Sequence, residues 1–289
     1  MNALLSDAMF DPLRIPLDRW FADFITWLTT NYRPTFQAMK RPIELILQNV
    51  EAFLLWLPPL VFIAVLALVA WRLAGWRIAV FTVVAFMLVG MIGLWNLTMT
   101  TLSMIVASVL VCLILGVPLG ILAARSDRFR GGLRPVLDVM QTTPAFVYLV
   151  PVVMLFSIGT VAGVIATIIF ALPPLIRLTD LGIRQVPEDV VEAAEAFGSS
   201  EREILMKVRL PLALPTIMAG INQTIMLALS MVVIAALIGA GGLGRPVVEG
   251  LNALRIGVAG IGGVAIVLLA IVLDRLTQAV GEGGRSRQG

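Results

Sequence analysis

The sequence predicts an all-α integral membrane protein with about seven transmembrane helices, its N-terminus outside the cell and its C-terminus in the cytoplasm. Hydrophobic residues make up 59% of the 289 residues and charged residues only 13%, and the mean hydropathy is +0.98. A soluble domain of this size leaves too much surface in water to hide so much apolar area. Long apolar runs also recur along the chain, and arginines collect between alternate runs.

Seven runs are long enough to cross the hydrocarbon, which takes roughly 20 apolar residues as a helix. A helix also pairs its own backbone hydrogen-bonding groups, as lipid requires. The fourth and fifth runs adjoin, and we divide them near residues 157–160. The predicted spans are residues 52–71, 78–95, 97–124, 139–159, 160–177, 212–239 and 256–273.

The arginines set the orientation, because loops on the cytoplasmic side of a membrane protein carry an excess of Arg and Lys. One alternate set of connections between the spans is rich in Arg and Lys, whereas the opposite short connections carry only Arg245 and Arg255. The basic set of connections therefore lies in the cytoplasm, with the N-terminus out and the C-terminus in. Its members are Arg72, Arg77, Arg125, Arg128, Arg130, Arg134, Arg184, Arg202, Lys207, Arg209, Arg285 and Arg287.

These spans divide the chain into four segments. Residues 1–51 form an extracytoplasmic N-terminal segment, residues 52–96 two accessory transmembrane helices, residues 97–280 a transmembrane core, and residues 281–289 a cytoplasmic tail. In the first segment an apolar face repeats at helical spacing, which predicts an amphipathic helix lying on the outer membrane surface or packed against the spans. That face consists of Leu17, Trp20, Phe21, Phe24, Ile25 and Leu28.

The longest inner connection, residues 179–211, predicts two short helices joined at a glycine. Pro187 and the acids after it favour a helix start, and Gly198 is a natural C-terminal cap for a helix over residues 188–197. Ser200 and Glu203 have capping-box spacing and start a second short helix, until Pro211 leads into the sixth span. Such a pair acts as a rigid peg for a partner or rests on the membrane as an ordinary loop.

Several chemistries are excluded by residues that the sequence lacks. It has no histidine and one cysteine, Cys112, which excludes an intramolecular disulfide, a Cys/His zinc site and a His-based triad. No G-x-x-x-x-G-K-[ST] motif occurs, so the chain does not cradle ATP through a P-loop. Residues 239–244 fit G-x-G-x-x-G, but they follow a membrane helix where a dinucleotide fold needs a strand. We expect no enzyme activity, cofactor or metal in this chain, and no nucleic-acid partner despite a pI of about 9.6.

The inner connection carries a longer motif. Glu192-Ala193-Ala194 is followed after three residues by Gly198, and after nine more by Val208-Arg209-Leu210-Pro211. This pattern resembles the EAA loop of ABC-importer permeases, with Val208 where isoleucine is commoner. The resemblance implies a type I ABC importer permease fold whose loop docks as a coupling helix on a separate ATPase. It assigns ATPase coupling to Glu192, Ala193, Ala194, Gly198, Val208, Leu210 and Pro211.

A closer similarity runs from about residue 97 to residue 280. Residues 141–151, 168–174, 215–224 and 274–279 resemble the permeases of this family that take up glycine betaine and proline betaine. The resemblance implies a multi-pass permease subunit in the bacterial cytoplasmic (inner) membrane. Its expected partners are a second copy of itself, two ATPase subunits that bind ATP and Mg, an extracytoplasmic substrate-binding protein and membrane lipid.

The solute pathway is less defined. A quaternary ammonium is best held by aromatic rings, and a carboxylate by polar side chains. Residues of these types in spans are also common as packing and interhelical hydrogen bonds, and that alternative stays open. The pathway candidates are Gln141, Thr142, Thr143, Phe146, Tyr148, Asn222, Gln223 and Ser230.

Three other functions compete with this interpretation. One is an ABC permease for choline, carnitine or trimethylamine N-oxide. Another is a stand-alone secondary transporter or channel, which would work without ATP or partners, although buried ionisable groups of the kind such transporters use are absent between the ends of most spans. A membrane enzyme is the third, but it needs a nucleophile–base pair or a metal cluster, and the sequence offers neither.

Overall fold

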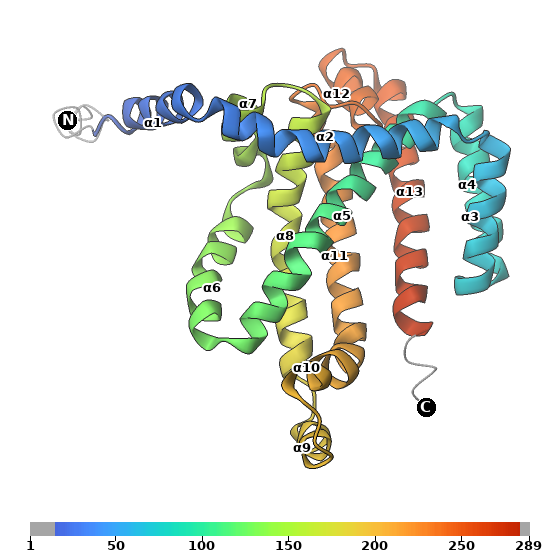
Figure 1. The fold of residues 1–289 in the computed structure, drawn as a ribbon. Helices are drawn as coiled ribbons and strands as arrows, with labels where there is room; N and C mark the ends of the chain where they lie inside the picture. Colours follow the sequence, from blue (N-terminus) through green and yellow to red (C-terminus); the bar gives the residue numbers. More distant parts are fainter. Residues whose placement is uncertain (1–14, 284–289) are drawn as a thin grey trace, which may run out of the picture.

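The computed structural model describes residues 15–283, and all regular secondary structure in that range is helical (Figure 1). Four of its helices are long and apolar enough to cross a membrane. They confirm the third, fifth, sixth and seventh predicted spans. They are α5 (Trp95–Arg125), α8 (Thr160–Arg184), the continuous helix Glu201–Ala236 that contains α11 (Leu210–Ala236), and α13 (Ile256–Gly283).

Helices α5, α8 and α11 form the tightly packed centre of the molecule. Gly116 and Gly120 lie one turn apart on α5 and face α8, where a Cβ atom at Gly120 would lie 2.5 Å from the Cβ of Thr179. On α11, a Cβ at Gly220 would lie 3.1 Å from the Cβ of Leu178. Small residues let membrane helices approach this closely, where dispersion contacts supply the attraction. The three helices therefore make a close-packed block.

The first two predicted spans need correction. A bend of 104° separates α2 (Arg33–Trp56) from α3 (Pro59–Ala74), so residues 52–71 are not one straight helix. Leu57 is extended (φ −73°, ψ 125°) because the proline after it disfavours the helical conformation, and Pro59 then starts α3. The second span becomes α4 (Trp76–Met91), whose 16 residues make about 24 Å of helix against roughly 30 Å of hydrocarbon.

The fourth predicted span is broken in the same way. Residues 139–159 fall on α6 (Asp127–Thr142), a 3₁₀ turn (Ala145–Tyr148) and α7 (Leu149–Phe156), with a bend of 105°. Thr143 is extended (ψ 125°) because Pro144 follows it. Within residues 15–283 the prediction of about seven spans becomes four, or up to six if each bent pair counts as one.

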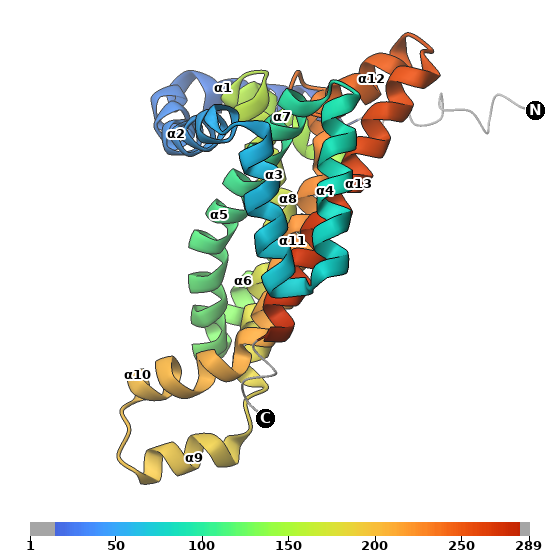
Figure 2. The same ribbon diagram turned by 90° about the vertical axis from the view of Figure 1, so that its right-hand side faces the viewer.

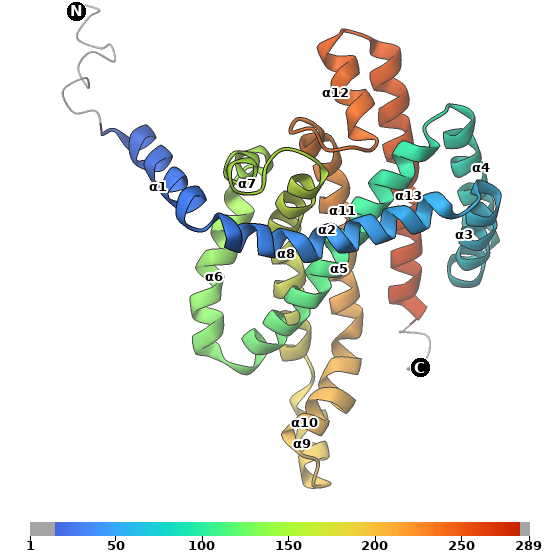
Figure 3. The same ribbon diagram turned by 45° about the horizontal axis from the view of Figure 1, so that its top comes forward.

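The N-terminal part contains one predicted and one unpredicted helix. The amphipathic helix is confirmed as α1 (Leu17–Asn31), with Trp20, Phe21 and Phe24 exposed and Ile25 buried. It contacts α7 near its junction with α2 and extends away from the bundle (Figure 3). Whether its aromatic face lies on the membrane stays a prediction. Helix α2 crosses the ends of the spans, through the predicted segment boundary at residues 51 and 52 (Figure 1).

The two ends of the bundle carry different elements. Helices α1, α2 and α12 (Gly244–Asn252) lie at one end, and α9 (Glu188–Ala196) and α10 (Glu201–Glu203) project from the other (Figures 1 and 2). The predicted sidedness requires this separation of the N-terminal helices from the loop at residues 179–211. Which end faces the cytoplasm stays a prediction.

Candidate functional site

The projection starts with α9, whose two ends are capped as predicted. Pro187 precedes the first turn, which carries Glu188 and Asp189 at the positive end of the helix dipole. At the other end Gly198 adopts a left-handed conformation (φ 80°). The Gly198 N–H donates to Glu195 O at 2.8 Å and the Ser199 N–H to Ala194 O at 3.0 Å. These two bonds form a Schellman motif, which requires a residue that tolerates positive φ.

The second arm of the projection begins at the predicted capping box. The Ser200 N–H donates to Glu203 Oε2 at 3.1 Å, and the Glu203 N–H donates to Ser200 Oγ at 3.4 Å. Lys207 Nζ donates to the other Glu203 oxygen at 2.9 Å. The sequence predicted that this arm ends at Pro211, but in the structure it does not. A π-helical turn (Ile204–Arg209) joins α10 to α11 without a break. The widened turn suits Pro211, which has no N–H to continue the α-helical ladder.

The two arms pack on each other and leave one surface exposed. Val191 of α9 and Ile204 of the second arm are buried. The exposed residues include Glu192, Ala193 and Gly198, together with Phe197, which is 92% exposed. Of the other predicted coupling residues, Ala194 is half-buried on α9. Val208 and Leu210 are half-buried where the second arm meets α11, and Pro211 is exposed on the first turn of α11.

Five of the pathway candidates come together at the bend between α6 and α7. Thr142 Oγ1 donates to Asp138 O at 2.9 Å and Thr143 Oγ1 to Val139 O at 2.7 Å, so both hydroxyls are used by the helix end. The Tyr148 hydroxyl donates to Met140 O and closes the bend. Gln141 is exposed, Phe146 is 62% exposed, and the Tyr148 ring centroid lies 6.4 Å from that of Phe170.

The other three candidates lie on α11. Asn222 is held by α13, because its Nδ2 donates to Asp274 Oδ1 at 3.2 Å and its Oδ1 accepts from Thr277 Oγ1 at 2.6 Å. The structure therefore gives Asn222 the interhelical hydrogen-bonding role that the sequence left open. Gln223 and Ser230, two turns apart, are exposed.

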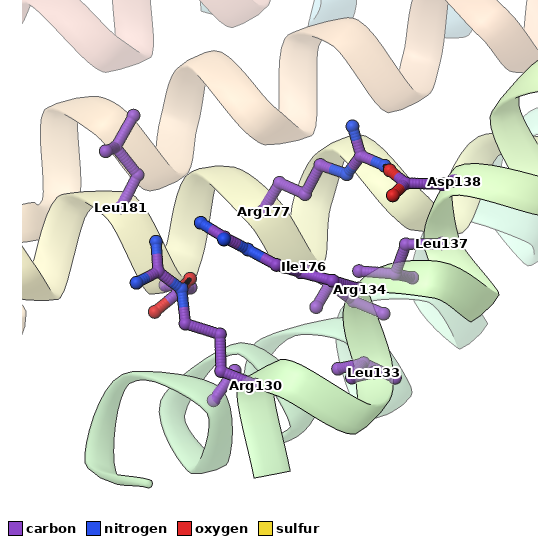
Figure 4. Close-up of a pocket in the computed structure, with 10 residues that line it drawn as sticks. Arg130, Leu133, Arg134, Leu137, Asp138, Ile176, Arg177 and Leu181 are labelled. Carbon is purple, nitrogen blue, oxygen red and sulfur yellow. Dashed lines mark hydrogen bonds and ion pairs between the residues drawn. The ribbon is translucent and has the colours of Figure 1, made fainter. Parts of the chain in front are cut away.

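A charged cavity that the sequence did not predict lies between α6 and α8 (Figure 4). Ala123 of α5 and Asp180 of α8 line it in the last turns of their helices, toward the end that carries the projection. Its volume is about 420 Å³. Arg130, Arg134 and Asp138 recur every fourth residue of α6 and line it from one side, and Arg177 and Asp180 of α8 line it from the other. The four-residue spacing of these charged residues could have predicted a charged face on this helix. The predicted fifth span stopped at Arg177 and so left Asp180 out of the bundle.

Comparison with known proteins links this fold to transport. Residues 116–283 match the family described as binding-protein-dependent transport system inner membrane component. The chain is 55% identical to the glycine betaine/proline betaine transport system permease protein ProW of Escherichia coli (strain K12), across 96% of this chain and 78% of that protein. It is 44% identical to the glycine betaine transport system permease protein OpuAB of Bacillus subtilis (strain 168), across 95% and 97%.

A solved structure of the MetNI methionine ABC transporter in an inward-facing conformation matches 64% of this chain and 92% of that chain, with a TM-score of 0.58 and 22% identity. This likeness confirms the expected type I ABC importer permease fold.

Proposed function

Because this chain belongs to the family of binding-protein-dependent transport system inner membrane components, we propose that it forms the transmembrane pathway of an ABC importer for glycine betaine and proline betaine. It is a multi-pass component of the cytoplasmic membrane. One observation carries the proposed solute: two permeases named for glycine betaine align with 95–96% of this chain at 44–55% identity. So long an alignment includes the bend between α6 and α7 as well as the projection.

A separate subunit supplies the energy in this proposal. The sequence has no P-loop, so two copies of a cytoplasmic ATPase bind ATP and Mg, and each docks the projection of one permease copy. The exposed Ala193 and Gly198 allow close approach of a groove on the ATPase. Glu192, Glu195 and Phe197 are exposed beside them and add two acids and a large apolar side chain to the docking surface. Because capped arms move together, closure of the ATPases would draw two projections together and favour the outward-open state. ATP hydrolysis then returns the transporter to the state in which the two projections are apart.

The exposed face of α11 supports a second copy of the chain beside a polar pathway. Gln223 makes no hydrogen bond with the described residues, and an unpaired amide facing lipid costs several kcal/mol. Contact with water in a pathway, or with the second copy, removes that cost. Ser230, two turns along the same face, lies beside the same pathway in this arrangement.

The aromatic residues at the bend form a weak transit site for the quaternary ammonium group. Phe146 is exposed, and Tyr148 and Phe170 lie close together, whereas Phe156 is buried and stacks edge-on against Phe36 at 5.6 Å. A partial cage of this kind attracts a cation without holding it long. An extracytoplasmic binding protein selects among solutes and delivers the chosen one from the side of the membrane opposite the ATPase.

Reconstitution tests the proposed function. The chain is placed in proteoliposomes with its ATPase and binding protein, and uptake is measured for glycine betaine, proline betaine, choline, carnitine and trimethylamine N-oxide. We expect ATP-dependent uptake of the two betaines, lost when either partner is omitted. Uphill uptake by the chain alone would contradict the proposal and favour a secondary transporter. A preference for choline, carnitine or trimethylamine N-oxide would overturn the proposed solute.

A further inference from the structure

A buried carboxylate joins two helices beside the charged cavity. Asp180 of α8 is 8% exposed, and its two oxygens contact two arginines. Arg184 Nε donates to Asp180 Oδ1 at 2.8 Å along the same helix. Arg130 Nε of α6 lies 2.8 Å from Asp180 Oδ2, but its N–H does not point at a hydrogen-bond acceptor. The contact between α6 and α8 is therefore ionic rather than directional.

Arg184 extends the same group of charges to the corner between α5 and α6. Its Nη2 atom donates to the backbone oxygen of Ala123, in the last turn of α5, at 2.8 Å. The same atom lies 2.8 Å from Asp127 Oδ1, on the first residue of α6. We call Asp180, Arg184, Arg130 and Asp127 the Asp180 joint. It ties the end of α5 and the start of α6 to the last turns of α8.

The position of the Asp180 joint gives it a mechanical role. Arg184 is the last residue of α8, and α9 of the projection begins at Glu188. Displacement of α9, the first arm of the projection, therefore reaches the Asp180 joint before the rest of α8, whereas the second arm runs directly into α11. Beyond it, α6 and α8 enclose the cavity of about 420 Å³ and are bridged again by Arg177 and Asp138 (Figure 4). Helix α6 is thus attached to α8 by ion pairs at both ends of a cavity whose lining mixes charged and apolar side chains, whereas α5 and α11 pack closely on α8 through glycines.

Stability is a poor explanation for this arrangement. Taking a carboxylate out of water costs about as much as its ionic partners return, so apolar side chains would hold the helices at least as well. A charge network around one buried carboxylate instead fixes a relative geometry, since a shift of either helix leaves Asp180 with an unpaired charge. That property suits a joint that passes movement on.

We propose that the Asp180 joint is a positioning element for energy coupling: it passes displacement of the projection to the α5–α6 corner, and thereby to the bend of α6 and α7. This inference rests on the proposed function. It assigns Arg130 and Asp180 to the step between ATP hydrolysis and opening of the pathway.

The test measures solute moved per ATP hydrolysed in proteoliposomes that contain the full complex. Arg130→Gln removes the ionic contact between α6 and α8 and leaves the Arg184–Asp180 pair in place. We expect this ratio to fall about five- to tenfold, the scale of a typical coupling between sites. Because the contact is ionic, Arg130→Lys should retain the ratio within about twofold. Arg134→Gln is the matched control, one turn along the same face of α6, where Arg134 makes no ion pair with the described residues.

An unchanged ratio in Arg130→Gln would overturn the proposal, and so would an equal loss in Arg134→Gln or no rescue in Arg130→Lys. If Arg130→Gln does not assemble, Asp127→Asn decides, because the Asp127 side chain is 85% exposed and tolerates the change. We then expect a loss of about two- to threefold, the smallest change typical of a single substitution that modulates coupling, and no loss would contradict the joint. Failure of the wild-type complex to couple ATP to betaine uptake would instead contradict the proposed function.

Discussion

Replacement of Gly198 tests the construction of the projection. Gly198 has φ 80°, and a Cβ atom built on it would meet nothing within 4 Å. A substitution there is therefore opposed by backbone conformation and not by a clash within the chain. Gly198→Val costs about 2 kcal/mol if the residue keeps positive φ. The alternative is to give up the two Schellman bonds, which costs about 1–3 kcal/mol in total. The cheaper response sets the cost, at about 1–2 kcal/mol.

That cost lowers the equilibrium ratio of capped to uncapped projection by roughly 5- to 30-fold. We expect uptake in proteoliposomes to fall in Gly198→Val by at most this factor, while ATP hydrolysis in the same vesicles falls less, because the ATPase no longer drives the pathway. Gly198→Asn should retain most uptake, since Asn tolerates positive φ. Gly260→Val is the matched control, because Gly260 also has open space at its Cβ position but lies inside α13.

Normal uptake by Gly198→Val at normal expression would refute this reasoning. Equal damage by Asn and Val would refute its conformational part, and would point to side-chain bulk at the ATPase surface as the cause.

Three further predictions concern the rest of the bundle. Gly120→Ala places a Cβ atom 2.5 Å from that of Thr179 and forces α5 away from α8. The temperature of half-unfolding in detergent should therefore fall by several degrees. The control Gly131→Ala, whose Cβ atom would meet nothing within 4 Å, should not lower it. Tyr148→Phe removes the bond to Met140 O and should cost about 1 kcal/mol in the same assay, and an unchanged midpoint would contradict a role in closing the bend. Asn222→Ala leaves Asp274 and Thr277 with fewer partners and should cost about 1–3 kcal/mol with an unchanged KM for solute, and a large rise in KM would return Asn222 to the pathway.

The projection could be predicted in detail because its signals are local. Pro187, Gly198, and the pair Ser200 and Glu203 each act within one turn of a helix end, and the caps in the structure are the expected ones. The continuous helix through Pro211 could not be predicted in the same way. It depends on a π-helical turn, which has no signature in residue type.

The bends illustrate a limit on interpreting proline. Pro144 follows an extended residue and ends α6, whereas Pro118, Pro173 and Pro174 lie inside α5 and α8 without ending them. The same residue type gives both results because packing against neighbouring helices decides whether the freed backbone groups find partners. Residue composition and spacing do not predict how the helices pack, so they do not predict which proline ends a helix.

Helix α2 and the charged cavity were missed for different reasons. Ile43, Leu47, Val50 and Leu54 follow helical spacing, and Leu47 and Leu54 are buried, but nearby charges kept this stretch below the hydropathy of a span. The partner of Asp180 on α6 could not be predicted. Arg130 is 50 residues away along the chain, so only the fold brings the two together.

Site-specific photo-crosslinking tests the central claim, that the projection docks on the ATPase, most directly. A photoreactive side chain replaces Phe197, which is 92% exposed on the projection, or Leu254, which is 87% exposed between α12 and α13 at the other end of the bundle. In the assembled complex we expect Phe197 to crosslink to the ATPase subunit and Leu254 not to do so. Crosslinks to the ATPase from Leu254, or their absence from Phe197 in a complex that transports normally, would contradict the account.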